Sequence, residues 1–201
     1  MRFRSFHMTV VLVLFFGGAV RAQEEGGEAT FGHLRIDSMR NVWHAVLADD
    51  GRGRLLCTWS ERSATGTRIR STMLRPFQRG QFDFVTVIEG DSCETVRPAA
   101  AYFRDGTALV TWQQGCDGRQ SIRGRILDTG GHPAGAVFTI NEGGYNAMMP
   151  AAGSMEDGAV LVTWQDFRNG ALDCFMQRFD SGGQPLGGNV MLNDDDARAL
   201  Q

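Results

Sequence analysis

One short phrase recurs along this chain and constrains its fold more than any other feature. It is clearest at residues 157–164 (DGAVLVTW) and 105–112 (DGTALVTW), and a looser copy runs from Asp50 to Trp59. In each copy an Asp-Gly pair, which is typical of a tight hairpin turn, precedes a run whose alternate residues are apolar. Each copy therefore predicts a hairpin that opens into a half-buried β-strand.

The spacing of the copies predicts a tandem array. Trp112 and Trp164 are 52 residues apart, and Trp59 lies 53 residues before Trp112. The same interval of 52 residues separates three other matched pairs, which are Asp128 and Asp180, Asn141 and Asn193, and Pro98 and Pro150. A period of about 50 residues with several strand signals in each unit is typical of propeller blades and related β-arrays.

The second and third units each contain four predicted strands. They cover residues 98–102, 107–112, 121–127 and 136–140 in the second unit, and 150–154, 159–164, 172–179 and 188–192 in the third. Long stretches with helical periodicity do not occur. The sequence therefore predicts an all-β fold of tandem four-stranded antiparallel blades, in three units at residues 44–97, 98–149 and 150–201.

These motifs resemble the repeats of secreted bacterial β-propeller-type proteins. The resemblance rests on the Asp-Gly to Val-Thr-Trp phrase, on residues 177–187 (QRFDSGGQPLG) and on Leu192-Asn193, and it covers about residues 44–201. It implies a propeller architecture but no particular activity, because such blades carry many unrelated functions. Three units are fewer than the roughly four or more blades of a closed propeller, so a partial or incomplete propeller is expected. Either the chain is the front part of a longer propeller, or its copies associate through their open blade edges.

The first 22 residues predict a secretory signal peptide. Arg2 and Arg4 give a basic start, residues 8–16 form an apolar run too short to cross a bilayer, and residues 20–22 resemble a cleavage site. Residues 23–43 then form an acidic, glycine-rich lead, which we expect to be flexible, and a lone strand. The expected location is secreted, periplasmic or at the cell surface, without a membrane span.

The charge of the chain argues against two classes of partner. The chain has no lysine, and beyond residue 22 its 17 arginines are outnumbered by 23 acidic residues, which gives a net charge of −6. This charge argues against a general affinity for nucleic acid or for anionic membranes. The absence of lysine also excludes Schiff-base and P-loop chemistry. No cofactor is expected.

The four cysteines fall into two pairs of different character. Cys57 and Cys174 align with apolar strand positions of the other units and are expected to be buried thiols. Cys93 and Cys116 stand in loops that would emerge on one face of a blade, so a disulfide between them is geometrically possible. It would add about 3 kcal/mol to the free energy of unfolding. The sequence leaves open whether this bridge forms. Cysteine and histidine spacings typical of a metal site do not occur.

Candidate binding residues lie in the loops between the second and third strands of the units. Loops on a rigid scaffold are where recognition concentrates, although plain connecting segments are an equally open interpretation. The first unit offers Glu61 and Arg62 in this loop. In the second and third units the candidates are Gln113, Gln114, Asp117, Arg119, Gln165, Asp166, Arg168 and Asn169. The three repeated tryptophans are in phase with apolar residues, so they are expected in the core rather than on a sugar-binding surface.

The sequence favours a secreted or surface propeller-like module that binds a protein or a glycan, without catalysis. A competing interpretation is a carbohydrate-active enzyme, glycosidase or sialidase-like, which would use carboxylates such as Asp117 and Asp166. The Asp-Gly phrases differ from the aspartate-box hairpins of sialidases, because six residues separate Gly106 from Trp112. A third interpretation is a truncated structural fragment of a longer propeller.

Overall fold

The computed structural model describes residues 42–193, except residues 63, 65, 75–85, 91–92 and 144–145. The predicted signal peptide and nearly all of the predicted acidic lead lie outside the described residues. The regular elements within that range are all strands. They are β1 (Val42–Asp49), β2 (Leu55–Arg62), β3 (Thr67–Leu74), β4 (Thr86–Gly90), β5 (Glu94–Tyr102), β6 (Ala108–Cys116), β7 (Arg119–Leu127), β8 (Pro133–Thr139), β9 (Ala147–Ser154), β10 (Val160–Asp166), β11 (Asp173–Phe179) and β12 (Val190–Met191).

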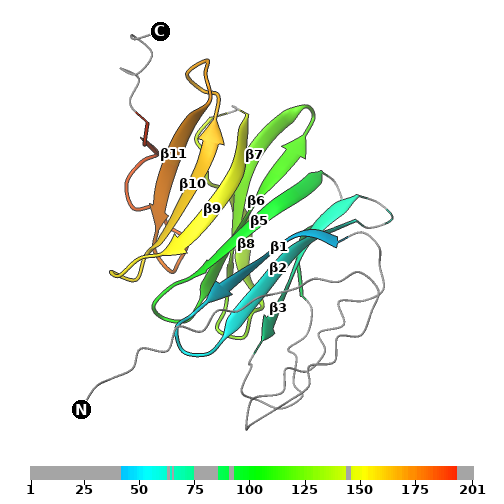
Figure 1. The fold of residues 1–201 in the computed structure, drawn as a ribbon, viewed down its shortest axis with the longest axis vertical. Helices are drawn as coiled ribbons and strands as arrows, with labels where there is room; N and C mark the ends of the chain where they lie inside the picture. The colour runs from blue at the N-terminus through cyan, green and yellow to red at the C-terminus, as the bar shows by residue number, and fades with distance from the viewer. Residues whose placement is uncertain are drawn as a thin grey trace, which may run out of the picture.

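The strands form three antiparallel sheets of four strands each, in sequence order (Figure 1). We call them sheet 1 (β1–β4), sheet 2 (β5–β8) and sheet 3 (β9–β12). Within each sheet, every strand pairs antiparallel with the next along the chain. The prediction of an all-β chain of tandem four-stranded blades is confirmed. In the part of the chain that the structure describes, no helix is long and apolar enough to span a membrane.

The sheets pack face to face, with their first strands closest together. β5 contacts β1, β2 and β3 of the preceding sheet, and β9 contacts β5, β6 and β7 in the same way. Figure 1 shows the three sheets fanned out side by side, with β1, β5 and β9 at neighbouring positions. We therefore call β1, β5 and β9 the inner strands, as in the blades of a propeller.

The inner strands begin earlier than the sequence predicts. β5 begins at Glu94 and β9 at Ala147, so the predicted unit boundaries at Pro98 and Pro150 fall inside these two strands. Both prolines follow a residue at which the pairing register shifts, and at such an irregularity no ladder N–H is needed. The proline therefore marks a bulge in the strand and not its start.

Two apolar cores lie between the sheets. Between sheets 1 and 2, Leu56 and Ile69 pack with Tyr102, Val110 and Trp112. The second core, between sheets 2 and 3, includes Leu109, Ile122, Val160, Val162 and Trp164. A buried ring of this size removes about 150–250 Å² from water, so the tryptophan-bearing strand is a main source of packing between successive sheets.

The three repeated tryptophans occupy matching positions in the sheets. Trp59 pairs across the sheet with Arg70, Trp112 with Arg123 and Trp164 with Phe175. Their exposed fractions are 1%, 0% and 1%, which confirms the expectation that they pack in the core.

The hairpins between first and second strands contact one another at one end of the sheets. We call this end, with residues 50–54, 103–107 and 155–159, the turn end. Arg52 Nη2 donates a hydrogen bond to the carbonyl of Arg104 (3.2 Å), and the backbone N–H of Arg104 donates to the carbonyl of Gly158 (3.4 Å). Gly158 has φ +95°, and a Cβ there would lie 2.9 Å from that of Arg104. Glycine is therefore required at this approach of two hairpins.

Candidate functional site

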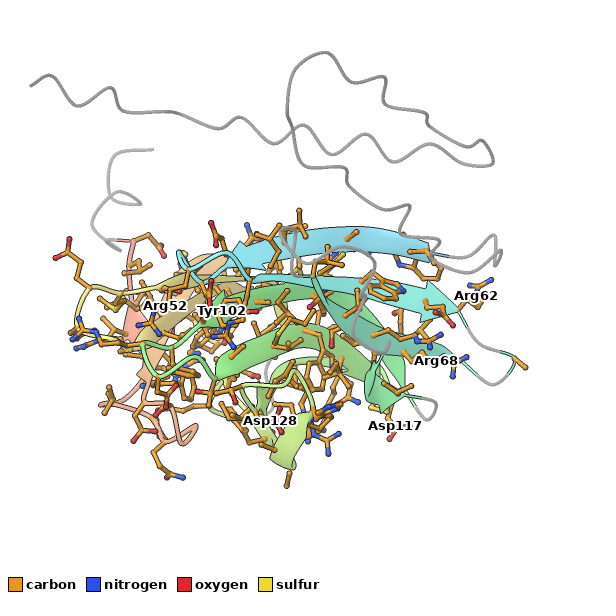
Figure 2. The ribbon with its side chains drawn as sticks, turned by 90° about the horizontal axis from the view of Figure 1, so that it is seen from below. Arg52, Arg62, Arg68, Tyr102, Asp117 and Asp128 are labelled. Carbon is orange, nitrogen blue, oxygen red and sulfur yellow. A yellow bond between two sulfur atoms is a disulfide. The ribbon has the colours of Figure 1, made fainter. Side chains whose placement is uncertain are left out.

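The opposite end of the sheets carries the connections between sheets and the hairpins between second and third strands, and we call it the loop end. The disulfide Cys93–Cys116, with its Cα atoms 5.1 Å apart, ties the connection before β5 to the end of β6. The backbone N–H of Gln120 donates to Oδ1 of Asn146 (3.1 Å) in the next connection. Figure 2 shows Arg62, Arg68 and Asp117 at this end, away from Arg52. The sequence left open whether Cys93 and Cys116 are bridged, and the structure shows that they are.

Each inner strand carries one exposed residue in the left-handed region of backbone conformation near the loop end. These residues are His44 (φ 53°), Arg97 (φ 53°) and Met149 (φ 54°). Each lies where the pairing of its strand shifts, so all three are β-bulges at equivalent places in successive sheets. A non-glycine residue with positive φ is uncommon, and bulges of this kind re-aim side chains next to functional sites. The three side chains are exposed on the innermost strands.

Polar contacts from the preceding sheet hold the bulge at Met149 and the start of β5. Gln113 Oε1 accepts a hydrogen bond from the backbone N–H of Met149 (3.2 Å), and Gln113 Nε2 donates to Oε1 of Gln120 (2.8 Å). At the start of β5, the backbone N–H of Thr95 donates to Oγ1 of Thr67 on β3 (2.6 Å). Gln113, a predicted binding residue, is therefore a nearly buried positioning residue for the inner strand of sheet 3.

An aromatic and basic cluster lies at the loop end of β1. The Trp43 and His44 rings meet edge to face with centroids 6.4 Å apart, and the guanidinium of Arg62 lies 6.0 Å from the centre of the Trp43 ring. Burial lowers the pKa of His44, and the positive charge of Arg97 lowers it further. The imidazole is therefore mainly neutral at pH 7. We call Trp43, His44, Arg62 and Arg97 the β1–β5 cluster.

The remaining candidates of sheet 2 lie on the surface. Asp117 is exposed in the two-residue turn between β6 and β7, where it has φ 50°, and Arg119 is exposed at the start of β7. Gln114 is half-buried, and Glu94 at the start of β5 is exposed near the same turn. Asp117, Arg119 and Glu94 are therefore available to a ligand at the loop end.

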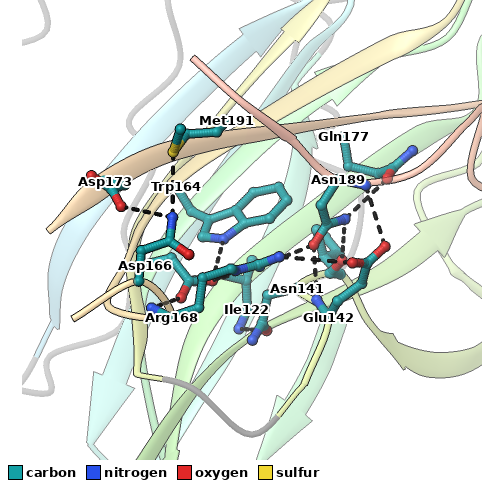
Figure 3. A network of polar contacts seen from close by, with 12 residues as sticks. Ile122, Asn141, Glu142, Trp164, Asp166, Arg168, Asp173, Gln177, Asn189 and Met191 are labelled. Atoms are coloured by element: carbon teal, nitrogen blue, oxygen red, sulfur yellow. Dashed lines mark hydrogen bonds and ion pairs between the residues drawn. The ribbon is translucent and has the colours of Figure 1, made fainter. Parts of the chain in front are cut away.

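In sheet 3, Asp166 is the centre of a buried polar network (Figure 3). Its exposed fraction is 0%, and it accepts hydrogen bonds from Trp164 Nε1 (3.2 Å) and from Arg168 through the backbone N–H (2.9 Å), Nε (3.1 Å) and Nη2 (2.6 Å). The Arg168 guanidinium also lies 4.0 Å from the centre of the Phe175 ring. These contacts saturate the carboxylate, which contradicts its expected position in an open loop.

The same network joins sheet 3 to the connection that precedes it. Arg168 Nη2 donates to Asn189 Oδ1 (3.1 Å), and Arg168 Nη1 lies 3.7 Å from Glu142 Oε2. Asn189 Nδ2 donates to Gln177 Oε1 (3.0 Å), while the backbone N–H of Glu142 donates to Asn189 Oδ1 (2.8 Å). Arg168 is therefore a structural residue.

The last two candidates in sheet 3 lie at its surface. Asn169 is exposed and donates from Nδ2 to Asp173 Oδ2 (3.0 Å). Gln165 is half-buried on β10.

The pair of carboxylates considered for glycoside hydrolysis does not form an open site. Asp117 is exposed, whereas Asp166 is buried and fully bonded, so the two cannot act together on a substrate. Glu61 is also buried and pairs with Arg70 (2.9 Å) and Arg68 (3.3 Å). Within the described residues, no group of three or more histidine, cysteine or acidic side chains could hold a metal ion.

Of the β1–β5 cluster, Arg62 lies in a predicted binding loop, whereas Trp43, His44 and Arg97 were missed because no motif marks them. The only signal is the proline that follows Arg97 and again follows Met149, and both prolines were predicted to begin strands. His44 is followed by alanine, so its equivalence to Arg97 becomes visible only through the shift in strand pairing.

Comparisons with known proteins connect the chain to solved structures only. It matches no protein-family model, and it matches no curated protein. An endo-arabinase from Bacteroides thetaiotaomicron VPI-5482 superposes with a TM-score of 0.51 at 13% identity, over 77% of this chain and 63% of that one. An α-L-arabinanase from Penicillium chrysogenum, solved with arabinobiose, gives 0.53 at 14% identity, over 76% and 45%. The Hadza microbial sialidase Hz136 gives 0.53 at 11% identity, over 77% and 38%.

This chain spans less than two thirds of the length of each of these structures. Identities of 11–14% show a shared fold and nothing about activity. The three tandem sheets, their inner strands and this likeness together show that the chain folds as part of a β-propeller.

Proposed function

We propose that this chain is three blades of an exported, carbohydrate-active propeller, and that its loop end binds saccharide. This proposal replaces a generic binding module as the leading interpretation. The observation that carries it is the β1–β5 cluster, where a half-buried indole, a neutral imidazole and the Arg62 guanidinium meet at the loop end of β1, beside the strand that bears Arg97.

The chemistry of the cluster suits a sugar. The C–H face of a sugar ring is apolar and packs against an aromatic ring such as Trp43, while its hydroxyl groups need hydrogen-bond donors and acceptors at the ring edge. Arg62 and Arg97 supply donors, and the neutral His44 supplies a donor and an acceptor. The similar structures, two arabinan-directed enzymes and a sialidase, support saccharides as the ligand class.

The proposal concerns recognition, because the described residues do not supply a hydrolytic pair. Glycoside hydrolysis requires two carboxyl groups on either side of the scissile bond, about 5–10 Å apart. Asp166 and Glu61 are buried in ion pairs, and among the described residues the acidic side chains exposed at the loop end are Glu94, Asp117 and Glu142.

The test is calorimetric titration of the purified protein with arabino-, xylo- and galacturono-oligosaccharides, lactose and sialyllactose, together with a hydrolase screen of the same sugars. We expect binding of at least one class with a Kd below about 1 mM, and at least a tenfold weaker affinity in Trp43→Leu. Leu186→Ala is the control, because it removes an exposed apolar side chain (43% exposed) near the turn end and should bind like the parent.

The absence of binding and of hydrolysis across the panel would contradict the proposal. In that case a protein-binding module or a structural fragment would be the better interpretation.

A further inference from the structure

We infer that the β1–β5 cluster selects saccharides that carry a carboxylate, with Arg97 as the residue that binds it. This inference rests on the proposed function and adds the substrate class. It concerns the same loop end and assigns the specificity to one side chain on the inner strand of sheet 2.

The first step is that the Arg97 guanidinium is free to bind a ligand. Arg97 is exposed, and among the described residues it forms no ion pair and no side-chain hydrogen bond. The other arginines near it are engaged differently, since Arg68 and Arg70 pair with Glu61 and Arg62 lies over Trp43. An unpaired guanidinium presents a fork of N–H donors that matches a carboxylate in a bidentate arrangement.

The second step is the surroundings of that guanidinium. β1 packs against β5, and His44 and Arg97 lie at equivalent bulges of these two neighbouring strands. The positive charge of Arg97 also lowers the pKa of His44. The His44 ring meets the Trp43 ring edge to face. A sugar ring stacked on Trp43 would therefore place a substituent at the edge of the sugar near the positive charge of Arg97. A carboxylate is the substituent that this charge attracts most strongly.

The third step is the backbone at Arg97. The residue has φ 53°, a conformation in which asparagine and glycine are favoured over arginine. An arginine there costs conformational energy that another residue would avoid, which is expected where the position serves a ligand. The disulfide at Cys93 and the hydrogen bond from Thr95 to Thr67 fix the strand on which Arg97 stands.

The experiment compares matched acidic and neutral sugars by calorimetry at low salt. Trigalacturonate is paired with its methyl ester, and sialyllactose with lactose, so the two arms distinguish a uronate from a sialate. We expect the protein to bind the acidic member of at least one pair about tenfold more tightly than its neutral partner. The preference should weaken as salt is added, since the pair is exposed.

The key variant is Arg97→Asn, which removes the charge and suits the left-handed backbone. Its melting temperature should equal or exceed that of the parent, while its preference for the acidic sugar disappears and its affinity for the neutral sugar is kept. Arg97→Lys should retain part of the preference, because it keeps a point charge without the planar fork. Arg52→Asn removes the same charge at the turn end and should leave the preference unchanged.

Each other outcome overturns the inference in a recognisable way. Equal binding of the acidic and neutral members would refute carboxylate selection while leaving saccharide recognition intact. A preference that survives in Arg97→Asn would show that another residue carries it. Failure to bind any sugar in either arm would refute the inference, and the proposed function would then depend on the arabino- and xylo-oligosaccharides of the wider panel.

Discussion

Gln113 on β6 accepts a hydrogen bond at 3.2 Å from the backbone N–H of Met149 on β9, so one side chain of sheet 2 holds the bulge in the inner strand of sheet 3. The repeat keeps Gln113: residue 165, at the matching place in sheet 3, is also glutamine. Leu161 and Thr163 likewise repeat Leu109 and Thr111. The face of sheet 3 that points away from sheet 2 therefore carries the same residue types with which sheet 2 contacts sheet 3.

Replacing Gln113 tests this contact. In Gln113→Leu the N–H of Met149 loses its acceptor at a partly buried site, so the free energy of unfolding should fall by about 1 kcal/mol. Gln165→Leu is the matched control, because the Gln165 side chain makes no hydrogen bond to another described residue, and its effect should stay within about 0.5 kcal/mol. Denaturant unfolding measures both variants, and equal losses would contradict the role of Gln113.

Asp166 should be among the residues to which stability is most sensitive. Asp166→Ala leaves the Arg168 guanidinium and the Trp164 indole N–H without their acceptor, so the expected loss is about 3–5 kcal/mol. Asp117→Asn, which removes the charge at the exposed turn and suits φ 50°, should change stability by no more than about 0.5 kcal/mol. Chemical unfolding distinguishes the two, and a small effect of Asp166→Ala would contradict its structural role.

The stability of the protein should depend on pH through His44. Burial and the charge of Arg97 lower its pKa in the folded state, so the unfolded chain takes up a proton first as the pH falls. His44 therefore destabilises the folded state progressively as the pH drops below about 7, through the ordinary pKa of about 6.5. His44→Asn, which does not titrate and suits φ 53°, should lose less stability between pH 7 and pH 5. Parallel stability curves for the two proteins would contradict this assignment.

The two free cysteines should differ in reactivity. Burial raises the pKa of the Cys57 thiol to about 11, whereas Cys174 is only half-buried. Because the thiolate is the reactive form, a thiol reagent at pH 8 should modify Cys174 in the folded protein and spare Cys57 until the chain unfolds. Mass spectrometry after short labelling identifies the site, and early modification of Cys57 would contradict its burial.

The repeat made most of the fold predictable. The Asp-Gly to Val-Thr-Trp phrase and its interval fix the second strand of each sheet, and the remaining strands follow from turns at constant spacing. The sequence showed for the same reason that a disulfide between Cys93 and Cys116 was possible, because blade topology places both loops at one end of the sheet. These features depend on local pattern and on repetition, which the sequence displays directly.

The site was less predictable, because it depends on contacts between residues far apart in sequence. Asp166 looks like a loop residue, yet Arg168 folds back onto it and Asn189 completes the network from beyond β11. Arg97 looks like an ordinary residue before a proline, and its left-handed conformation follows from a shift in strand pairing. Alternation of apolar residues carries no information about either arrangement.

The most direct test of the central claim is nuclear magnetic resonance of the ¹⁵N-labelled protein during titration with the saccharide that binds best. Saccharide recognition at the loop end predicts that the Trp43 indole N–H and the backbone amides of His44, Arg97 and Asp117 shift, while those of Gly106 and Gly131 at the turn end stay in place. Shifts confined to the turn end, or no shifts at saturating sugar, would contradict the account.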